Sequence, residues 1–531
     1  MKKLSILTLL FVFLSASFTF SQETKKKITL NEIWHLYKFY PKTVHGINSL
    51  DNGKQYTMIK DGSLVVYNYA TGDSAGVLLQ KEKLIPEGRK KPLHLSSYKM
   101  SNDEKKFLIP TATESIYRHS KKSEFYVYDE NTSAIKPLSD GGKQRLADFN
   151  PSGDKVAFVR ENNIFIKDLQ SGDEKQITTD GKVNEIINGT CDWVYEEEFG
   201  FTKAFFWSPD GKKIAYYRFD ESRVKEYTLT YYGKLYPRLY TYKYPKAGED
   251  NSMVEIYVYN LETGQSTKMD TGDDTDTYIP RIKWTKDANV LSIQHLNRLQ
   301  NHLEILLADA STGKTRVMYV DDNPYYIDIT DDLTFLPDNK RFIITSEKDG
   351  FNHIYLCTLN GKKEKRLTKG DWDVTKVYGY DAENEVVYYQ SAELSPLNRD
   401  IYKVNLKGKR SRISTRVGTN DATFSKNFEY YINTYSNANT PPYITMNRNS
   451  GEELRILEDN QAFRDLMATY DLSQKTFSSF TDSVVTLPNG KQTYLNTWQI
   501  LPPDFDSTKK YPVLLYQYSG PGSQSVVNSW G

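Results

Sequence analysis

The chain has 531 residues, of which 38% are hydrophobic and 26% are charged, and 40 of them are tyrosine. This length exceeds a single small core, so we expect at least two domains or a repeated architecture. The formal net charge of +1 offers no overall field that would attract nucleic acid or an anionic membrane. Cys191 and Cys357 are the only cysteines; they exclude a disulfide framework, leave one isolated bridge possible and lack zinc-type spacing. We therefore expect no nucleic-acid partner, no metal and no cofactor.

The first 21 residues have the order of a secretory signal peptide. Lys2 and Lys3 precede the apolar run LSILTLLFVFL, and small residues then lead to Ser21. A retained membrane anchor is the alternative, but the apolar run is short for a bilayer span. No segment after Gln22 is apolar enough to cross a membrane. We expect an exported mature protein, in the periplasm, on the cell surface or secreted, with no membrane contact after leader removal.

A repeated phrase of an aromatic residue, a turn and an apolar strand extends through most of the chain. WSPDGKKIAYYR over residues 207–218 resembles FNPSGDKVAFVR over residues 149–160. Further copies begin at Asn48, Met100, Trp284, Phe335, Tyr380 and Phe424. The copies recur every roughly 40 to 50 residues, which is the length of a propeller blade. Two consecutive β-sandwiches are the alternative, but they require no recurrent phrase. The sequence therefore predicts a mainly β fold with an eight-bladed β-propeller over residues 46–475.

Residues 218–254 interrupt the fourth unit with a segment rich in Tyr and Lys. Tyr alternates with polar residues here, which predicts an extended hairpin. An isolated hairpin is marginal in water, so this one should pack against another surface. Its residues leave two partners open, a second subunit or the rim of the same propeller.

After about Phe477 the repeat gives way to a different pattern. Strands flank a turn at residues 488–490, and the apolar run YPVLLYQY over residues 511–518 precedes a Gly/Pro loop. A buried strand followed by such a loop is typical of the start of an α/β sheet. We expect residues 476–531 to form the first strands of an incomplete α/β domain.

One serine motif is rejected as a catalytic site. Residues 72–76 match the G-x-S-x-G nucleophile elbow around Ser74, but an elbow needs a buried strand before the serine and a helix after it. Other repeats hold polar turns at the same position, so a turn between propeller strands explains these residues. The seven histidines do not pair with a serine and a carboxylate in a convincing order, and no complete catalytic triad is recognised.

Residues 192–199, DWVYEEEF, form the most specific segment. Three adjacent carboxylates beside aromatic side chains repel one another and favour a bound cation, although a solvated acidic turn would also fit them. A strand would direct neighbouring side chains to opposite faces, so two glutamates converge on one ligand only in a helical turn or a bulge. Arg118 in the segment SIYRHS is a candidate companion, because a guanidinium donates several hydrogen bonds in a fixed geometry.

Together, DWVYEEEF, IYRHS, YTYKYPKAGEDN, the WSPDGK phrases and YPVLLYQYSGPGSQ resemble dipeptidyl-peptidase IV of the prolyl oligopeptidase clan (serine peptidase family S9), in its bacterial exported form. The resemblance implies an eight-bladed propeller that caps an α/β-hydrolase domain, and release of dipeptides with Pro or Ala as the second residue. It implies that Glu197 and Glu198 hold the α-amino group of a peptide substrate, and that Arg118 binds the substrate backbone. It assigns Tyr518 to the oxyanion hole and gives the insertion at residues 218–254 a role in homodimer formation.

The resemblance also concerns the two ends of the chain. It implies that residues 22–45 pack on the hydrolase side, and that the catalytic serine, aspartate and histidine lie beyond Gly531. We therefore expect the 531-residue chain alone to be inactive. A non-catalytic propeller that binds peptides or proteins is the alternative from another functional class, although it would not need the run at residues 511–518. A prolyl tripeptidyl peptidase is the alternative within the clan, and the intact EEE cluster disfavours it.

Overall fold

The computed structural model describes residues 25–486, 492–518, 520 and 522–531. The signal peptide predicted over residues 1–21 and the turn predicted at residues 488–490 lie outside them. The chain forms two compact units: the larger comprises residues 45–433 and 445–455, and the smaller comprises the residues up to 44 with 434–444 and 456–531. No helix among the described residues has the length and apolar character needed to cross a bilayer.

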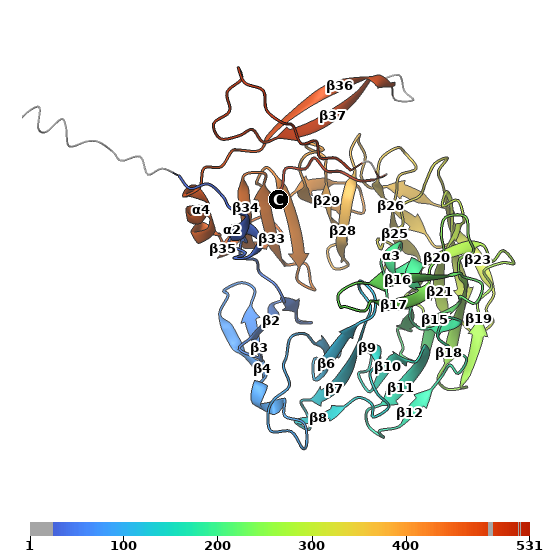
Figure 1. Ribbon diagram of the computed structural model, residues 1–531. Helices are drawn as coiled ribbons and strands as arrows, with labels where there is room; N and C mark the ends of the chain where they lie inside the picture. The colour runs from blue at the N-terminus through green and yellow to red at the C-terminus, as the bar shows by residue number, and fades with distance from the viewer. Residues whose placement is uncertain (1–24, 487–491, 519, 521) are drawn as a thin grey trace, which may run out of the picture. The chain divides into compact units, whose positions relative to one another are not determined.

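Among the described residues, eight β-sheets of four or five strands follow one another along the chain (Figure 1). The first four sheets contain β1 (Asn48–Ser49), β2 (Gln55–Lys60), β3 (Ser63–Asn68) and β4 (Ser74–Leu79); β5 (Lys99–Met100), β6 (Lys106–Ser115), β7 (Lys121–Asp129) and β8 (Ala134–Pro137); β9 (Arg145–Phe149), β10 (Lys155–Arg160), β11 (Asn163–Asp168) and β12 (Glu174–Gln176); β13 (Ile186–Asn188), β14 (Phe205–Trp207), β15 (Lys213–Asp220), β18 (Met253–Asn260) and β19 (Gln265–Lys268). The last four contain β20 (Thr277–Trp284), β21 (Val290–Asn297), β22 (His302–Asp309) and β23 (Thr315–Asp322); β24 (Thr334–Phe335), β25 (Arg341–Ser346), β26 (His353–Thr358) and β27 (Glu364–Arg366); β28 (Val374–Asp381), β29 (Val386–Ser391), β30 (Asp400–Asn405) and β31 (Arg410–Arg412); β32 (Thr419–Phe424), β33 (Tyr430–Asn437), β34 (Thr440–Arg448) and β35 (Glu453–Glu458). These sheets are the blades of an eight-bladed β-propeller, as the repeat predicted.

The repeated phrase links two neighbouring antiparallel strands of a blade. In WSPDGK, β14 ends at Trp207 and β15 begins at Lys213. The Ser208 hydroxyl donates to Asp210 at 2.5 Å and accepts from the Lys213 N–H at 2.9 Å. Gly211 has a φ of +69°, a conformation that glycine adopts without strain. The recurrent serine, aspartate and glycine therefore build the same turn in each copy that keeps them.

The core lies between neighbouring blades. Val156 and Phe158 on β10 are fully buried, and they cluster with Phe149 of their own blade and Leu108 of the preceding blade. A single blade has two apolar faces, so stacking against both neighbours is what removes them from water. Among the described residues, both cysteines are buried and free, so the one isolated bridge left open by the sequence is not formed.

The insertion in blade four folds as the predicted hairpin. β16 (Glu226–Tyr231) pairs antiparallel with β17 (Arg238–Lys243), between β15 and β18 of the blade. Tyr242, near the base, is buried, whereas Leu235 and Tyr236 at the tip are 92% and 84% exposed. The base therefore packs on its own propeller, and the tip leaves an apolar surface uncovered within this chain.

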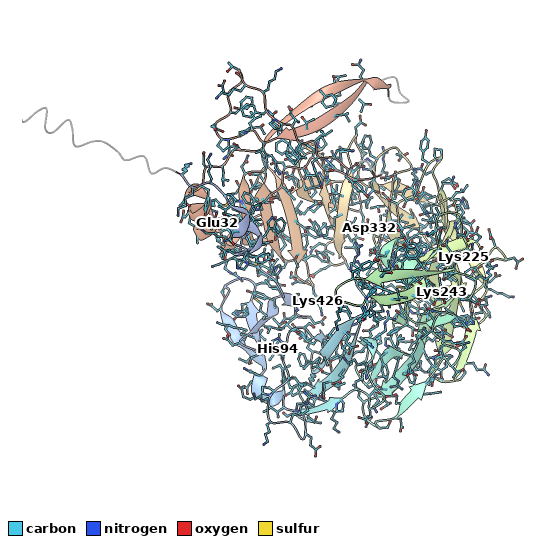
Figure 2. All side chains as sticks on the ribbon, viewed as in Figure 1. Glu32, His94, Lys225, Lys243, Asp332 and Lys426 are labelled. Carbon is cyan, nitrogen blue, oxygen red and sulfur yellow. The ribbon has the colours of Figure 1, made fainter. Side chains whose placement is uncertain are left out.

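The described part of the smaller unit includes two short helices and a hairpin, beside parts of the blade-eight strands. It contains α2 (Leu30–Trp34), α4 (Gln461–Ala468), β36 (Thr476–Thr486) and β37 (Gln492–Gln499), and β37 pairs antiparallel with β36. Glu32 (Figure 2) accepts hydrogen bonds from Tyr470 at 2.5 Å and Lys38 at 3.0 Å, which lower the pKa of its carboxyl to about 2. The Asn460 amide donates to the Lys42 carbonyl at 3.0 Å. These contacts join the N-terminal segment to the region around α4.

The apolar run at residues 511–518 differs from its prediction. It forms no strand, and Val513, Leu514 and Leu515 are 90%, 94% and 83% exposed. A strand of a parallel sheet needs paired neighbours and cover on both faces. No strand among the described residues pairs with this run. The buried strand expected here is therefore wrong for this structure.

Candidate functional site

The acidic segment forms the predicted helical turn. Helix α3 (Trp193–Glu197) begins after Asp192, whose carboxylate caps the helix by accepting the Tyr195 N–H at 2.9 Å. Ser252 donates to the other carboxylate oxygen of Asp192 at 2.6 Å. Burial raises the pKa of Asp192, and these hydrogen bonds oppose the rise. A fixed N-cap places the following glutamates at the end of a short, rigid element.

The three glutamates of the segment have different environments. Successive residues on a helix are about 100° apart, so adjacent side chains leave in different directions. Glu196 is 1% exposed, and its Oε1 accepts the backbone N–H groups of His119 at 2.7 Å and Ser120 at 2.9 Å. Glu197 is partly buried, and Glu198 is exposed at the helix C-cap. Glu196 is thus buried and binds the helix to the backbone at residues 119 and 120. Glu197 and Glu198 are available to a ligand.

Arg118 lies beside the helix, as the sequence analysis proposed. Its Nε is 3.3 Å from Oε2 of Glu197, and its side chain is 71% exposed. The Ile116 N–H donates to the Ser120 carbonyl at 2.8 Å, which closes a tight turn around the arginine. Because Glu196 binds the backbone of this turn, it holds Arg118 next to Glu197. The structure therefore brings together Arg118, Glu197 and Glu198.

Aromatic side chains from the base of the hairpin flank this cluster. The ring centroid of Trp193 on α3 is 4.2 Å from that of Tyr244, and the centroid of Tyr117, next to Arg118, is 5.8 Å from that of Tyr242. These contacts connect the blade-four insertion both to helix α3 and to the turn that contains Arg118. The sequence does not indicate this role, because Tyr242 and Tyr244 lie more than 40 residues after the acidic segment and nothing local relates them to it.

Two further residues near the cluster were also missed. Burial raises the pKa of Tyr326, and the charges of Asp328 and Glu198 add to the rise. Burial lowers the pKa of Arg145, and the charge of Glu196 opposes the shift. Among the described residues, Arg145 Nε and Glu196 Oε2 are buried without a hydrogen-bond partner. Their charges therefore compensate each other through space.

Tyr518 belongs to the smaller unit, whereas the other predicted site residues belong to the larger unit. Its side chain is 68% exposed at the end of the irregular run. Ser74 is the first residue of β4, in the β3–β4 hairpin, and pairs with Tyr67. A strand follows it where a nucleophile elbow needs a helix, so the structure agrees with the rejection of Ser74 as a nucleophile. The described residues include no group of three or more His, Cys, Asp or Glu side chains arranged for a metal ion.

Comparisons with known proteins agree with this architecture. A family model for the dipeptidyl peptidase IV N-terminal region matches residues 101–442. A probable dipeptidyl peptidase 4 of Aspergillus flavus is 30% identical over 536 residues, with 96% of this chain and 67% of that protein covered. The crystal structure of Porphyromonas gingivalis dipeptidyl peptidase 4 is 42% identical with a TM-score of 0.88, and 95% of this chain and 71% of that chain are covered. A putative dipeptidyl aminopeptidase IV from Bacteroides ovatus is 26% identical with a TM-score of 0.75. The chain therefore belongs to the dipeptidyl peptidase IV family of serine peptidases.

Proposed function

We propose that this propeller anchors the free amino terminus of a peptide for a serine exopeptidase that releases X-Pro or X-Ala dipeptides. The observation that carries the proposal is the cluster of Glu197, Glu198 and Arg118, built on a helix end that Glu196 ties to the arginine turn. The dipeptidyl peptidases to which the chain is similar support the reaction class.

The chemistry of the cluster suits an α-ammonium group. A peptide amino terminus has a pKa near 8, so it is mostly charged at neutral pH. Glu197 and Glu198 would bind it through charge-assisted hydrogen bonds, and Arg118 would bind a substrate carbonyl. Fixing the amino terminus at one place sets how many residues precede the scissile bond. The cluster would thus act as a ruler for dipeptides.

The proposal also assigns roles to residues outside the acidic cluster. Tyr518 would donate its phenolic O–H to the oxyanion of the tetrahedral intermediate. The chain spans 67% of the Aspergillus flavus relative, and we propose that residues 1–531 alone do not hydrolyse peptides. Turnover of Gly-Pro-p-nitroanilide by this purified chain, inhibited by a serine reagent, would disprove that part. We also propose that the leader over residues 1–21 exports the protein, which N-terminal sequencing of the mature form would test.

A homodimer through the blade-four hairpin is part of the same proposal. The exposed tip residues Tyr232, Leu235 and Tyr236 form an apolar surface that a second copy would cover. Sedimentation velocity on the Leu235→Lys protein should show monomers where the parent protein shows dimers. A parent protein that sediments as a monomer at micromolar concentration would refute the dimer.

The anchor is tested by kinetics of the full gene product with peptides that differ only at the amino terminus. We expect N-acetylation of a Gly-Pro substrate to abolish turnover. Glu197→Gln should lower kcat/KM for the free peptide by roughly 10- to 150-fold, because a hydrogen bond to a charged group contributes about 1.5 to 3 kcal/mol. Glu262→Gln is the matched control, since Glu262 is an exposed carboxylate of the same blade that pairs with Lys212.

The same experiment separates the alternatives. Equal kcat/KM for the parent and Glu197→Gln proteins would refute the anchor. Release of tripeptides would indicate the tripeptidyl peptidase, and binding of the free peptide without any cleavage by the full gene product would indicate a non-catalytic propeller.

A further inference from the structure

A cavity of about 600 Å³ lies between blades four and five, apart from the residues proposed to anchor the substrate. It is walled by β14 of blade four, by β20 of blade five and by the segments that follow α3 and precede β24. This volume is within the range of sites that enclose small organic molecules. All of its lining residues belong to the larger unit.

The charges that line the cavity are mostly positive. Lys203, Arg281 and Lys283 line it together with one carboxylate, Asp331. Asp331 forms an ion pair with Arg281, in which Oδ1 of Asp331 is 2.5 Å from Nε of Arg281. Lys203 pairs with Asp148, which Lys99 also contacts, so one carboxylate serves two lysines.

Lys283 is the cation with the least compensation. Its Nζ donates to the Leu333 carbonyl at 2.5 Å, and among the described residues no carboxylate lies within ion-pair distance of it. The nearest acidic groups are Asp331, which Arg281 holds, and Asp332 (Figure 2), whose pKa burial raises. Lys286 adds a further positive charge nearby. An anion in the cavity would therefore find a cation without a committed partner.

Aromatic side chains form a large part of the remaining walls, together with polar residues such as Thr202, Ser292, Gln294 and Thr330. Phe201, Phe206, Trp207 and Trp284 line the cavity. Both indole N–H groups are already used, by the Asp148 carbonyl at 3.3 Å and the Phe206 carbonyl at 3.0 Å. The tryptophans therefore offer apolar ring surface to a ligand and no free donor. A ligand that fits these walls has an aromatic or otherwise flat apolar body.

We propose that this cavity binds a small organic anion, such as an aromatic carboxylate or sulfonate, with its charged group on Lys283 and its apolar body against Trp207 and Trp284. The lowered pKa values of Lys203 and Lys283, which result from burial, accord with this assignment, because a bound anion would restore favourable surroundings for both charges.

Isothermal titration calorimetry with naphthalene-1-sulfonate tests the site on the full 531-residue chain. We expect binding of one sulfonate per chain, and at least about tenfold weaker binding of 1-naphthalenemethanol, which has the same rings without the charge. Inorganic phosphate, which has charge without rings, should also bind at least about tenfold more weakly. Equal affinity for the sulfonate and either comparison compound, or no heat of binding, would overturn the proposal.

Variants locate the site. Lys283→Met should weaken sulfonate binding at least about tenfold, and Lys283→Arg should retain it. Lys340→Met is the matched control, since Lys340 is exposed in the turn between β24 and β25 and does not line the cavity. If Lys283→Met does not fold, as judged by circular dichroism, Lys283→Gln takes its place. Unchanged affinity in the folded variant would refute the assignment. Glu197→Gln should bind the sulfonate normally, so failure of the peptidase proposal would not affect this result.

Discussion

The acidic cluster on α3 and the cation-lined cavity surround their central charges in different ways. Glu196 is enclosed by protein, but two backbone N–H groups and the charge of Arg145 surround it. Lys283 is exposed, and among the described residues the Leu333 carbonyl oxygen is its only hydrogen-bond acceptor. The cost of a buried charge depends on the groups that compensate it, and not on its sign. The two regions should therefore respond differently when their central charge is removed.

Glu196→Ala should give the largest effect. It leaves the His119 and Ser120 N–H groups and the Arg145 guanidinium without the carboxylate that they face. We expect the free energy of unfolding to fall by about 2 to 5 kcal/mol, measured by urea denaturation. The turn that carries Arg118 should also loosen, so kcat/KM of the full gene product for Gly-Pro-p-nitroanilide should fall.

The conservative variant separates positioning from charge. Glu196→Gln keeps an oxygen that can accept both N–H groups, so it should retain the Arg118 turn and most of the activity. It loses only the attraction to Arg145. Equal losses of stability and kcat/KM in Glu196→Ala and Glu196→Gln would show that the hydrogen bonds from the turn to Glu196 do not position Arg118.

Glu221→Gln should give the next largest effect and the opposite sign. Burial raises the pKa of Glu221 to about 7, the charge of Asp192 adds to the rise, and Lys243 (Figure 2) opposes it. Between pH 4.5, the ordinary value for the unfolded chain, and pH 7, unfolding releases a proton that the folded protein keeps. Stability is thus fully present below pH 4.5 and falls as pH rises toward 7.

A glutamine at position 221 stays neutral at every pH, so this fall should vanish. The variant should exceed the parent protein by up to about 3 kcal/mol at pH 8 and match it at pH 4, in urea denaturation series across that range. Glu87→Gln, on an exposed turn, should retain the slope of the parent. A parallel pair of curves for the parent and Glu221→Gln would contradict the role of Glu221.

The acidic cluster and the cavity also differ in how far the sequence predicts them. The blades follow from a local phrase, because Ser208, Asp210 and Gly211 form their turn within a few residues. The cluster was predicted for the same reason, since one octapeptide carries the glutamates and the helix. The octapeptide alone does not distinguish Glu196 from Glu197, because burial depends on contacts with a turn 76 residues away. Only the family resemblance assigned the ligand role to Glu197 and Glu198.

The cavity and the apolar run could not be predicted in this way. Lys203, Arg281 and Asp148 come from three blades, and no local pattern relates residues so far apart. The run at residues 511–518 has the composition of a buried strand, but composition does not provide partner strands. Local sequence therefore specifies the strands and turns. Which charges are compensated and which segments are buried depends on neighbours from distant parts of the chain.

Arg118→Met should have a small effect on stability, which sharpens the contrast with Glu196 in the same cluster. Arg118 is 71% exposed, so solvent screens its pair with Glu197. Such surface pairs contribute about 0 to 1 kcal/mol, and we expect the change in unfolding free energy to stay within that range. Activity toward Gly-Pro-p-nitroanilide should nevertheless fall, because the proposed contact with the substrate is lost. A destabilisation comparable to that of Glu196→Ala would show that Arg118 supports the fold.

Lys283→Met should have the smallest effect, and it should not be destabilising. Because the pKa of Lys283 is lowered by burial, the folded state disfavours its charge below that pKa, and stability recovers as pH rises toward the unfolded value. Methionine removes this penalty and keeps apolar contacts along the stem. In urea at pH 7 the variant should therefore be as stable as the parent or slightly more so, with Lys340→Met as the reference. A loss above about 1 kcal/mol would mean that the bond from Lys283 to the Leu333 carbonyl supports the fold. Equal or higher stability together with lost sulfonate binding would mean that the lysine is retained for a ligand, because the fold gains nothing from its charge.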